Sequence, residues 1–221
     1  MSYVNIGIED LDLLIGEGVL EGSLILLLGD VGSGAELFAQ QALYKQVENG
    51  VKCTYFLVEK QSEDVKSEMS LYGFDVQAFE DSGDWRFIPV DESTSLTNLS
   101  DALVKNIKEG RWTFIDSLSP IILGSDLKQT IKLVKTIKTT ARNSGGLHFI
   151  HVVRGMHGGY VESALKYYAD GVFEFEFRPA IRGIGRLLIL SKLRGIIPEF
   201  ETLPYKITNR GITIETATRI V

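Results

Sequence analysis

The sequence predicts an α/β fold: a mainly parallel central sheet flanked by helices, with an antiparallel β extension at its C-terminal end. Up to Tyr168, short apolar runs alternate with longer amphipathic segments, which is typical of strands joined by helices. Beyond Gly171, strand-like segments follow one another with short turns and no helix between them. Because no repeat, linker or low-complexity stretch interrupts the 221 residues, we expect a single domain spanning residues 1–221.

Short apolar runs predict the strands of the parallel core. The first run is closed at once by Gly29 and Asp30, residues that end a buried strand. The later runs are separated by stretches long enough to hold a helix. The expected strands are Leu24–Leu28, Thr54–Val58, Arg86–Pro89, Trp112–Ile115 and Leu147–Val152.

Amphipathic segments predict five helices. The fourth is the clearest, because Leu127, Ile131 and Val134 share one face and lysines lie on the opposite face. Gly145 and the glycine after it end this helix. The expected helices lie at about Glu36–Glu48, Glu63–Leu71, Thr97–Lys108, Leu127–Asn143 and Val161–Tyr168.

Four strand patterns in succession predict the C-terminal extension. A tight turn at 209–211 joins the last two, and no helical pattern intervenes between the four. Antiparallel pairing at the edge of the sheet is the simplest arrangement. These strands are expected at Val172–Phe177, Gly185–Lys192, Tyr205–Thr208 and Ile212–Glu215.

Composition indicates an ordinary soluble protein, with 44% hydrophobic and 24% charged residues. No apolar run approaches the about 18 residues needed to span a bilayer, so no membrane association is expected. The N-terminus lacks the pattern of a secretory signal, and a single cysteine, Cys53, excludes an internal disulfide; both fit a cytoplasmic protein. The net charge of −6 argues against nucleic acid as a partner, because phosphate binding needs a surplus of Lys and Arg.

A glycine-rich turn follows the first strand and opens the first helix. In a phosphate-binding P-loop this turn reads G-x-x-x-x-G-K-[ST]: backbone N–H groups and the Lys bind phosphates, and the hydroxyl binds Mg²⁺. Both glycines of the pattern are present, but Ala35 stands in place of the Lys and Glu36 in place of the Ser or Thr. The eight loop residues are Gly29, Asp30, Val31, Gly32, Ser33, Gly34, Ala35 and Glu36.

The altered loop is expected to bind ATP and Mg²⁺ weakly or not at all. Each charge-assisted hydrogen bond to phosphate is worth about 1.5–3 kcal/mol, and here Asp30 and Glu36 repel phosphate where a Lys would attract it. No cofactor is therefore expected. Two other interpretations stay open. The turn could simply pack a helix against the sheet, or it could belong to a dinucleotide site, although Leu37 takes the place of that motif's third glycine.

Further segments occur in an order shared with one ATPase superfamily. Gly7–Ser23 resembles the entry to its P-loop strand, and Trp112–Ser119 resembles its Walker B strand, an apolar run that ends in Asp-Ser. Ala169–Val172, Ser191–Gly195 and Ile207–Ile212 resemble its later landmarks. The chain is thus similar over nearly its whole length to RecA/KaiC-like, RadA-related P-loop ATPases, which are common in archaea. The resemblance implies a RecA-like three-layer fold.

The same resemblance implies roles for individual residues. Asp116 matches the acid that positions Mg²⁺, and Glu59 matches the first of two glutamates that activate the attacking water; Lys60 stands at the second position. Lys192 and Arg194 match cations that reach the nucleotide site of the neighbouring subunit, so they are inter-subunit candidates. Without the resemblance, Asp116 could cap the segment after its strand, and the other charges could simply be solvated.

Three histidines lie near one another in the sequence, at His148, His151 and His157. Residues three apart on a strand face opposite sides, and no Cys or carboxylate completes a ligand set, so no metal site is expected. His151, at the end of its strand, could line the candidate site. The resemblance places a DNA-contacting loop of RecA-type proteins at Arg154–Tyr160, but one Arg and one His are a weak footprint for DNA.

These observations favour a KaiC-like domain with an inactivated P-loop, a pseudo-ATPase that acts through protein–protein interaction or oligomerisation in regulation. In one arrangement, Asp30 and Glu36 pair with Lys192 and Arg194 of an adjoining subunit. An alternative is an unconventional ATPase in which Lys60, or Lys192 of a neighbour, replaces the missing lysine. A further alternative, a DNA recombination accessory protein, rests on the resemblance alone.

Overall fold

The computed structural model describes residues 2–91, 94–180, 183–196 and 202–215. Nine of the described strands form one sheet, and two more form a small ribbon near the N-terminus. The ribbon strands are β1 (Tyr3–Val4) and β2 (Val19–Leu20). The sheet strands are β3 (Ser23–Gly29), β4 (Cys53–Val58), β5 (Trp85–Val90), β6 (Trp112–Asp116), β7 (Leu147–Val153), β8 (Gly171–Ala180), β9 (Gly183–Leu193), β10 (Thr202–Thr208) and β11 (Gly211–Ile214).

The strands are ordered β11-β10-β9-β8-β3-β7-β6-β4-β5 across the sheet. The pairs from β8 to β5 are parallel, and β9, β10 and β11 add antiparallel pairs. The predicted parallel core with its antiparallel C-terminal extension is therefore confirmed. One detail differs from the prediction. β8 belongs to both parts, because the helix before it supplies a crossover that makes it parallel to β3.

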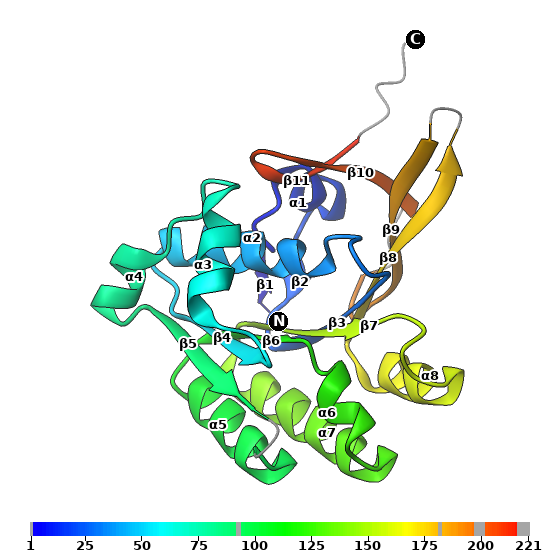
Figure 1. Ribbon diagram of the computed structural model, residues 1–221. Helices are drawn as coiled ribbons and strands as arrows, with labels where there is room; N and C mark the ends of the chain where they lie inside the picture. The colour runs from blue at the N-terminus through cyan, green and yellow to red at the C-terminus, as the bar shows by residue number, and fades with distance from the viewer. Residues whose placement is uncertain (1, 92–93, 181–182, 197–201, 216–221) are drawn as a thin grey trace.

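Helices cover both faces of the sheet and give three layers (Figure 1). On one face lie α1 (Glu9–Ile15), α2 (Ala35–Glu48), α3 (Ser62–Ser70) and α4 (Gln77–Ser82). On the other lie α5 (Leu96–Lys108), α6 (Ser119–Leu123), α7 (Leu127–Ser144) and α8 (Gly159–Tyr168). The five predicted helices are all present. The sequence prediction omits α1, α4 and α6, because segments of five to seven residues show too little apolar periodicity.

The central strand β3 is buried along its whole length. Its side chains alternate between two cores: Ile25 and Leu27 pack on the α2 side, and Leu24, Leu26 and Leu28 pack on the α7 side. Each such side chain contributes about 1.5–3 kcal/mol by burial. This strand is therefore a rigid support for the loop that follows it.

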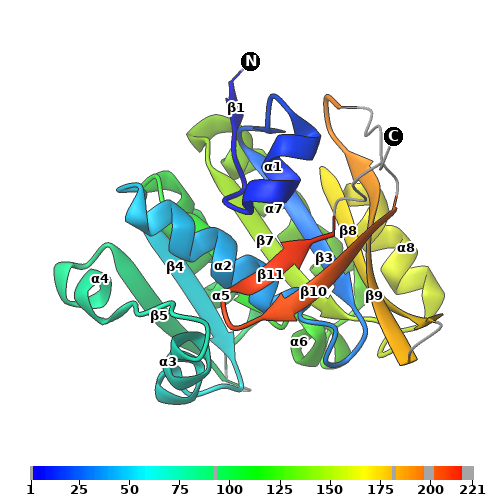
Figure 2. The same ribbon diagram turned by 90° about the horizontal axis from the view of Figure 1, so that it is seen from above.

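The last two strands bend over α2 (Figure 2). Gln41 of α2 donates through Nε2 to the carbonyl oxygen of Ile212 at 3.1 Å and accepts a hydrogen bond from the backbone nitrogen of Ile212 at 2.6 Å. A Cβ atom at Gly34 would lie 2.7 Å from Cδ1 of Ile207. The C-terminal extension thus covers the junction between the loop and α2. No described helix is long and apolar enough to cross a membrane.

Candidate functional site

The glycine-rich loop lies between β3 and α2, at the carboxyl edge of the parallel strands, where open α/β sheets bind ligands. Gly34 precedes α2 with a φ of 89°, a left-handed conformation that suits glycine. Ala35 is fully buried, and Glu36 lies in the first turn of α2, where a negative charge is favoured by the helix dipole. The strand–turn–helix geometry of a phosphate-binding loop is present. A methyl group, on Ala35, takes the place of the Lys, and a carboxylate, on Glu36, takes the place of the Ser or Thr.

Contacts within the chain hold this loop on both sides. On the β8 side, Oδ2 of Asp30 accepts a hydrogen bond from the backbone nitrogen of Phe177 at 3.0 Å, and Nε of Arg154 lies 3.4 Å from Oδ1 of Asp30. On the β10 side, the hydroxyl of Tyr205 donates to the carbonyl oxygen of Ser33 at 2.6 Å. The loop is therefore fixed by side chains of its own chain.

Asp116, at the end of β6, is fully buried and has three donors around its carboxylate. The Tyr55 hydroxyl and Nζ of Lys60 lie 2.5 Å and 2.6 Å from Oδ2. Nδ1 of His151 lies 3.0 Å from Oδ1. Gln40 of α2 donates to the Tyr55 hydroxyl at 3.2 Å and extends the network toward the loop. Both oxygens of Asp116 are thus bonded to groups of the same chain.

The ionisation of this cluster follows from burial and from its neighbours. Burial favours the neutral form of Asp116, but the hydrogen bond from His151 and the charge of Lys60 outweigh burial and lower the Asp116 pKa to about 2. Burial, together with the charge of Asp116, raises the pKa of Tyr55 well above its usual value. At neutral pH, Asp116 is therefore an anion and Tyr55 is a neutral donor.

Glu59, directly after β4, has an unusual backbone. Its φ of 54° is the only positive φ of a non-glycine residue in the described part of the chain, and this conformation is disfavoured for glutamate. Its backbone nitrogen donates to the carbonyl oxygen of Val90 at 3.1 Å. The side chain is exposed and lines a cavity of about 490 Å³ together with polar residues that include Ser95, Ser125 and Gln129. The turn therefore presents the Glu59 carboxylate to solvent and to this cavity, whose lining is both polar and apolar.

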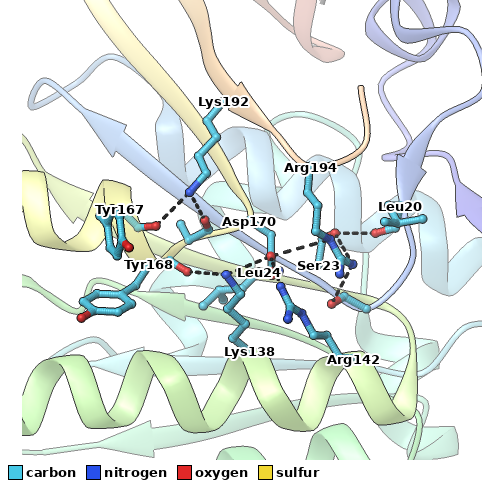
Figure 3. A network of polar contacts seen from close by, with 12 residues as sticks. Leu20, Ser23, Leu24, Lys138, Arg142, Tyr167, Tyr168, Asp170, Lys192 and Arg194 are labelled. Atoms are coloured by element: carbon cyan, nitrogen blue, oxygen red, sulfur yellow. Dashed lines mark hydrogen bonds and ion pairs between the residues drawn. The ribbon is translucent and has the colours of Figure 1, made fainter. Parts of the chain in front are cut away.

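Asp170 lies between α8 and β8, at the amino ends of the parallel strands and thus opposite the glycine-rich loop. Three cations surround its carboxylate (Figure 3). Its Oδ1 is 3.1 Å from Nζ of Lys138, 3.1 Å from Nη2 of Arg142 and 3.6 Å from Nε of Arg194. Its Oδ2 accepts a hydrogen bond from the backbone nitrogen of Leu24 at 3.3 Å. This buried carboxylate therefore ties α7 and the end of β9 to the start of β3.

Lys192 and Arg194 both donate to backbone groups of their own chain (Figure 3). Nζ of Lys192 bonds the carbonyl oxygens of Ala169 at 2.6 Å and Tyr167 at 2.9 Å, and so caps the end of α8. Nη2 of Arg194 bonds the carbonyl oxygen of Glu21 at 3.1 Å. The length of β3, roughly 20 Å, separates these cations from the loop at the other edge of the sheet. An inter-subunit role of these two residues stays a prediction.

The histidines have separate environments. His148 is fully buried, where Nδ1 lies 3.0 Å from the hydroxyl of Thr113 and Nε2 lies 3.0 Å from the carbonyl oxygen of Gly145. Burial lowers the pKa of His148 to about 4, so its imidazole is neutral at physiological pH. His151 instead contacts Asp116. Within the described residues, no group of three or more His, Cys, Asp or Glu side chains is arranged to hold a metal ion.

The loop after β3 and the buried aspartate at the end of β6 lie within a stretch that matches one family model. That model, described as the KaiC ATPase, matches residues 4–219. The chain belongs to the KaiC ATPase family. Its curated relatives include a UPF0273 protein of Thermotoga maritima, 23% identical over 97% of this chain and 96% of that protein. The circadian clock oscillator protein KaiC of Parathermosynechococcus lividus is 27% identical over 98% of this chain, which spans 41% of that protein.

Solved structures show the same fold. The KaiC-like protein of Pyrococcus horikoshii superposes with a TM-score of 0.83 at 23% identity, covering 97% of this chain and 99% of that one. The flagellar accessory protein FlaH of Methanocaldococcus jannaschii superposes with a TM-score of 0.75 at 19% identity, covering 94% and 96%. The RecA/KaiC-like three-layer fold that the sequence predicts is therefore confirmed.

In the structure of this KaiC-family chain, some of the predicted site residues contact one another, and others lie far from them. Lys60 and His151 meet at Asp116, whereas Lys192 and Arg194 lie at the far edge of the sheet. Sequence reasoning missed the partnership of Tyr55 with Asp116. A signal for it exists, because a tyrosine inside a buried strand needs a hydrogen-bond partner for its hydroxyl.

Proposed function

We propose that this KaiC-family domain does not hydrolyse ATP and acts in regulation through protein–protein contact. The observation that carries the proposal is the contact of 2.6 Å between Nζ of Lys60 and Oδ2 of Asp116. By resemblance, Asp116 would position Mg²⁺ and position 60 would hold a second activating glutamate. Lys60 reverses the charge that hydrolysis needs at position 60, and its ammonium group pairs with the carboxylate that Mg²⁺ would need at Asp116.

The residues of the loop also do not fit MgATP. Ala35 is a buried methyl group where phosphate binding needs an ammonium, and Glu36 places a carboxylate where Mg²⁺ binding needs a hydroxyl. Asp30 adds a second negative charge, and its carboxylate is already bonded to Phe177 and Arg154. We therefore derive no hydrolytic step for this site.

Exposed apolar side chains near the loop support a role in protein contact. Val31, in the loop, is 81% exposed. Met156 and Tyr160, in the segment after β7, are 41% and 78% exposed. A hydrogen bond of 2.8 Å from the backbone nitrogen of Arg154 to the carbonyl oxygen of Gly29 joins the two segments. Large apolar side chains gathered at one edge are typical of a surface that another protein covers.

A neighbouring copy could place Lys192 and Arg194 against Asp30 and Glu36 of this loop, since the charges are opposite. The substitution Glu36→Gln tests this arrangement, because it leaves the bonds of Lys192 and Arg194 to their own chain in place. Weaker self-association of the variant in sedimentation would support the contact. An unchanged sedimentation coefficient at every protein concentration would count against it.

The alternative of a DNA accessory protein receives no support from the charges around the loop. Nη2 of Arg154 lies 2.9 Å from Glu174 and 3.3 Å from Glu176, and Nε lies 3.4 Å from Asp30. This arginine is therefore outnumbered by carboxylates and offers no surplus positive charge to phosphate. Fluorescence anisotropy with a labelled single strand at low salt tests the point, and we expect no binding.

Isothermal titration with MgATP, followed by a turnover assay, tests the main proposal. We expect no binding heat at millimolar ATP and no phosphate release. Micromolar binding with turnover would overturn the proposal and favour the unconventional ATPase. In that case the variant Glu59→Gln shows which protein hydrolyses ATP. If the variant loses hydrolysis, the activity belongs to this site, and if hydrolysis is unchanged, it comes from a contaminant.

A further inference from the structure

Helix α7 concentrates positive charge in an acidic protein. Its 18 residues contain five cations and no carboxylate, while the whole chain has a net charge of −6. The five are Lys128, Lys132, Lys135, Lys138 and Arg142. Such a helix is a strong electrostatic feature, because its charge is not balanced along its own surface.

Within the part of the chain that the structure describes, two of the α7 cations are paired with a carboxylate, and the other three, called the free lysines below, are not. Lys138 and Arg142 bind Asp170. In contrast, Lys128, Lys132 and Lys135 are exposed, and none has a carboxylate within 4 Å among the described residues. Lys135 lies 4.6 Å from the centre of the Tyr168 ring. Spacings of four and three residues place the three free lysines on one side of the helix.

A shallow groove of about 600 Å³ follows this side of α7. The three free lysines line it together with Ile131 and threonines that include Thr136. We call this surface the basic face, defined by Lys128, Lys132 and Lys135. It combines three exposed positive charges with the partly buried apolar side chain of Ile131, which suits an anionic protein surface.

A surface of opposite charge lies on α3, on α4 and on the segment between them. Five exposed carboxylates gather there, and Lys66 is half-buried and bonded to Glu80 at 3.1 Å. Leu71, directly after α3, is 72% exposed among them. We call this surface the acidic face. Its exposed carboxylates are Glu63, Asp64, Glu68, Asp75 and Asp81.

The two faces lie on opposite sides of the central sheet (Figure 1). Val65 and Met69 of α3 pack in the core on the α2 side, and Leu133 and Val134 of α7 pack in the other core. The faces of one molecule therefore cannot meet each other. A second copy can offer its acidic face to the basic face of the first, and the same contact can repeat in a head-to-tail series.

The spacing of charges fits this pairing. Asp64 and Glu68 are four residues apart on α3, and Lys128 and Lys132 are four residues apart on α7. In both helices this spacing corresponds to a rise of about 6 Å. Neither Asp64 nor Glu68 has a cation within 4 Å among the described residues. Two unpaired carboxylates can thus face two unpaired ammonium groups in register.

We propose that the basic face of α7 docks on the acidic face of α3 and α4 of a second copy of this chain. This deepens the proposed function by naming a partner for protein contact, and it uses a surface other than the loop. Exposed ion pairs are screened by salt, with a Debye length of about 10 Å at 0.1 M. The assembly is therefore concentration-dependent and weakens as salt is raised.

Sedimentation velocity without nucleotide tests the proposal. We expect association in low salt, about 50 mM, and monomers in about 500 mM salt. Each charge reversal is made in a parent that carries Glu36→Gln, which weakens the loop contact proposed above. In this background, Lys128→Glu/Lys132→Glu should be monomeric in low salt, and so should Asp64→Lys/Glu68→Lys. Combining all four substitutions in one chain should restore association, because the charges are exchanged and remain complementary. The control Lys108→Glu/Arg210→Glu reverses two exposed cations outside both faces and should associate like the wild type.

Several results would overturn the proposal. Wild-type protein that is monomeric in low salt would do so, as would charge reversals without effect or a combined variant that stays monomeric. Binding of a labelled oligonucleotide by monomeric wild type, lost in Lys128→Glu/Lys132→Glu, would assign the basic face to nucleic acid instead. None of these results bears on ATP binding, so the proposed lack of hydrolysis is tested separately.

Discussion

The ammonium nitrogen of Lys60 lies 2.6 Å from Oδ2 of Asp116, so an exposed turn after β4 is tied to a fully buried carboxylate at the end of β6. His151 and Tyr55 complete the contacts of that carboxylate. These contacts explain how the charged Asp116 can stay inside this KaiC-family fold. A buried anion is tolerated when cations and hydrogen-bond donors surround it.

Replacing Lys60 by Met should lower the free energy of unfolding by about 1–2 kcal/mol at pH 7. The variant removes the cation but leaves Asp116 buried with two donors, and the partial exposure of Lys60 reduces the effect. Urea unfolding followed by circular dichroism measures the change. The matched control is Lys52→Met, whose pair with Asp84 is exposed and 3.9 Å long. Equal losses in both variants would show that the Lys60 contact is energetically ordinary.

The main strands were predictable because each is a continuous apolar run with clear ends. Leu24–Leu28 appears as Ser23–Gly29 and Thr54–Val58 appears as Cys53–Val58, each within one residue of the expected bounds. Burial on both faces of the sheet requires such runs, and glycine or charge ends them. Local sequence therefore carries this part of the fold.

The contacts of the candidate site were not predictable in the same way. Tyr55 and Asp116 are 61 residues apart in sequence, and they meet because β4 pairs in parallel with β6. That order of strands is set by the packing of the whole sheet, and spacing along the chain does not encode it. The sequence indicated that position 60 carries a positive charge where the resembling ATPases carry a glutamate. That Lys60 pairs with Asp116 is seen only in the folded structure.

Stability should fall as the pH is lowered from 6.5 to about 4, because of His148. The imidazole stays neutral in the folded chain until about pH 4, whereas the unfolded chain binds the proton near pH 6.5. The unfolded state then holds more protons, so the folded state loses about 3 kcal/mol over this range. Urea unfolding at several pH values measures the slope, and His148→Gln should flatten it. Parallel curves for the two proteins would contradict the prediction.

Below pH 4, a second loss should appear in both the wild type and His148→Gln. The Asp116 pKa is held at about 2 in the folded chain, against a usual value of 3.8. This lowered pKa stabilises the fold above pH 4, and the stabilisation disappears as the pH falls toward 2. The loss below pH 4 therefore serves as an internal control, since the substitution at His148 does not touch Asp116.

Tyr205→Phe should free the glycine-rich loop. The variant removes the hydrogen bond from the Tyr205 hydroxyl to the carbonyl oxygen of Ser33, at a cost of about 1 kcal/mol. Amide hydrogen exchange of the loop should become faster, while exchange in the core of β3 should not change. The control Tyr167→Phe alters a tyrosine that is 74% exposed. If loop exchange is equal in the two variants, the Tyr205 contact does not hold the loop.

Restoring the phosphate-binding residues should create affinity for ATP in steps. Ala35→Lys/Glu36→Thr supplies an ammonium and a hydroxyl, and it should raise the association constant for MgATP at least about tenfold, since one charge-assisted hydrogen bond is worth about 1.5–3 kcal/mol. Adding Lys60→Glu releases Asp116 from its cation and should raise the constant further. Because Ala35 is fully buried, the double variant should melt at a lower temperature without ATP and recover with MgATP. Glu36→Thr alone is the control, for it removes repulsion without adding an ammonium. If the triple variant binds no better than this control, the loop geometry itself excludes phosphate, and the identity of residues 35, 36 and 60 does not explain the weak affinity.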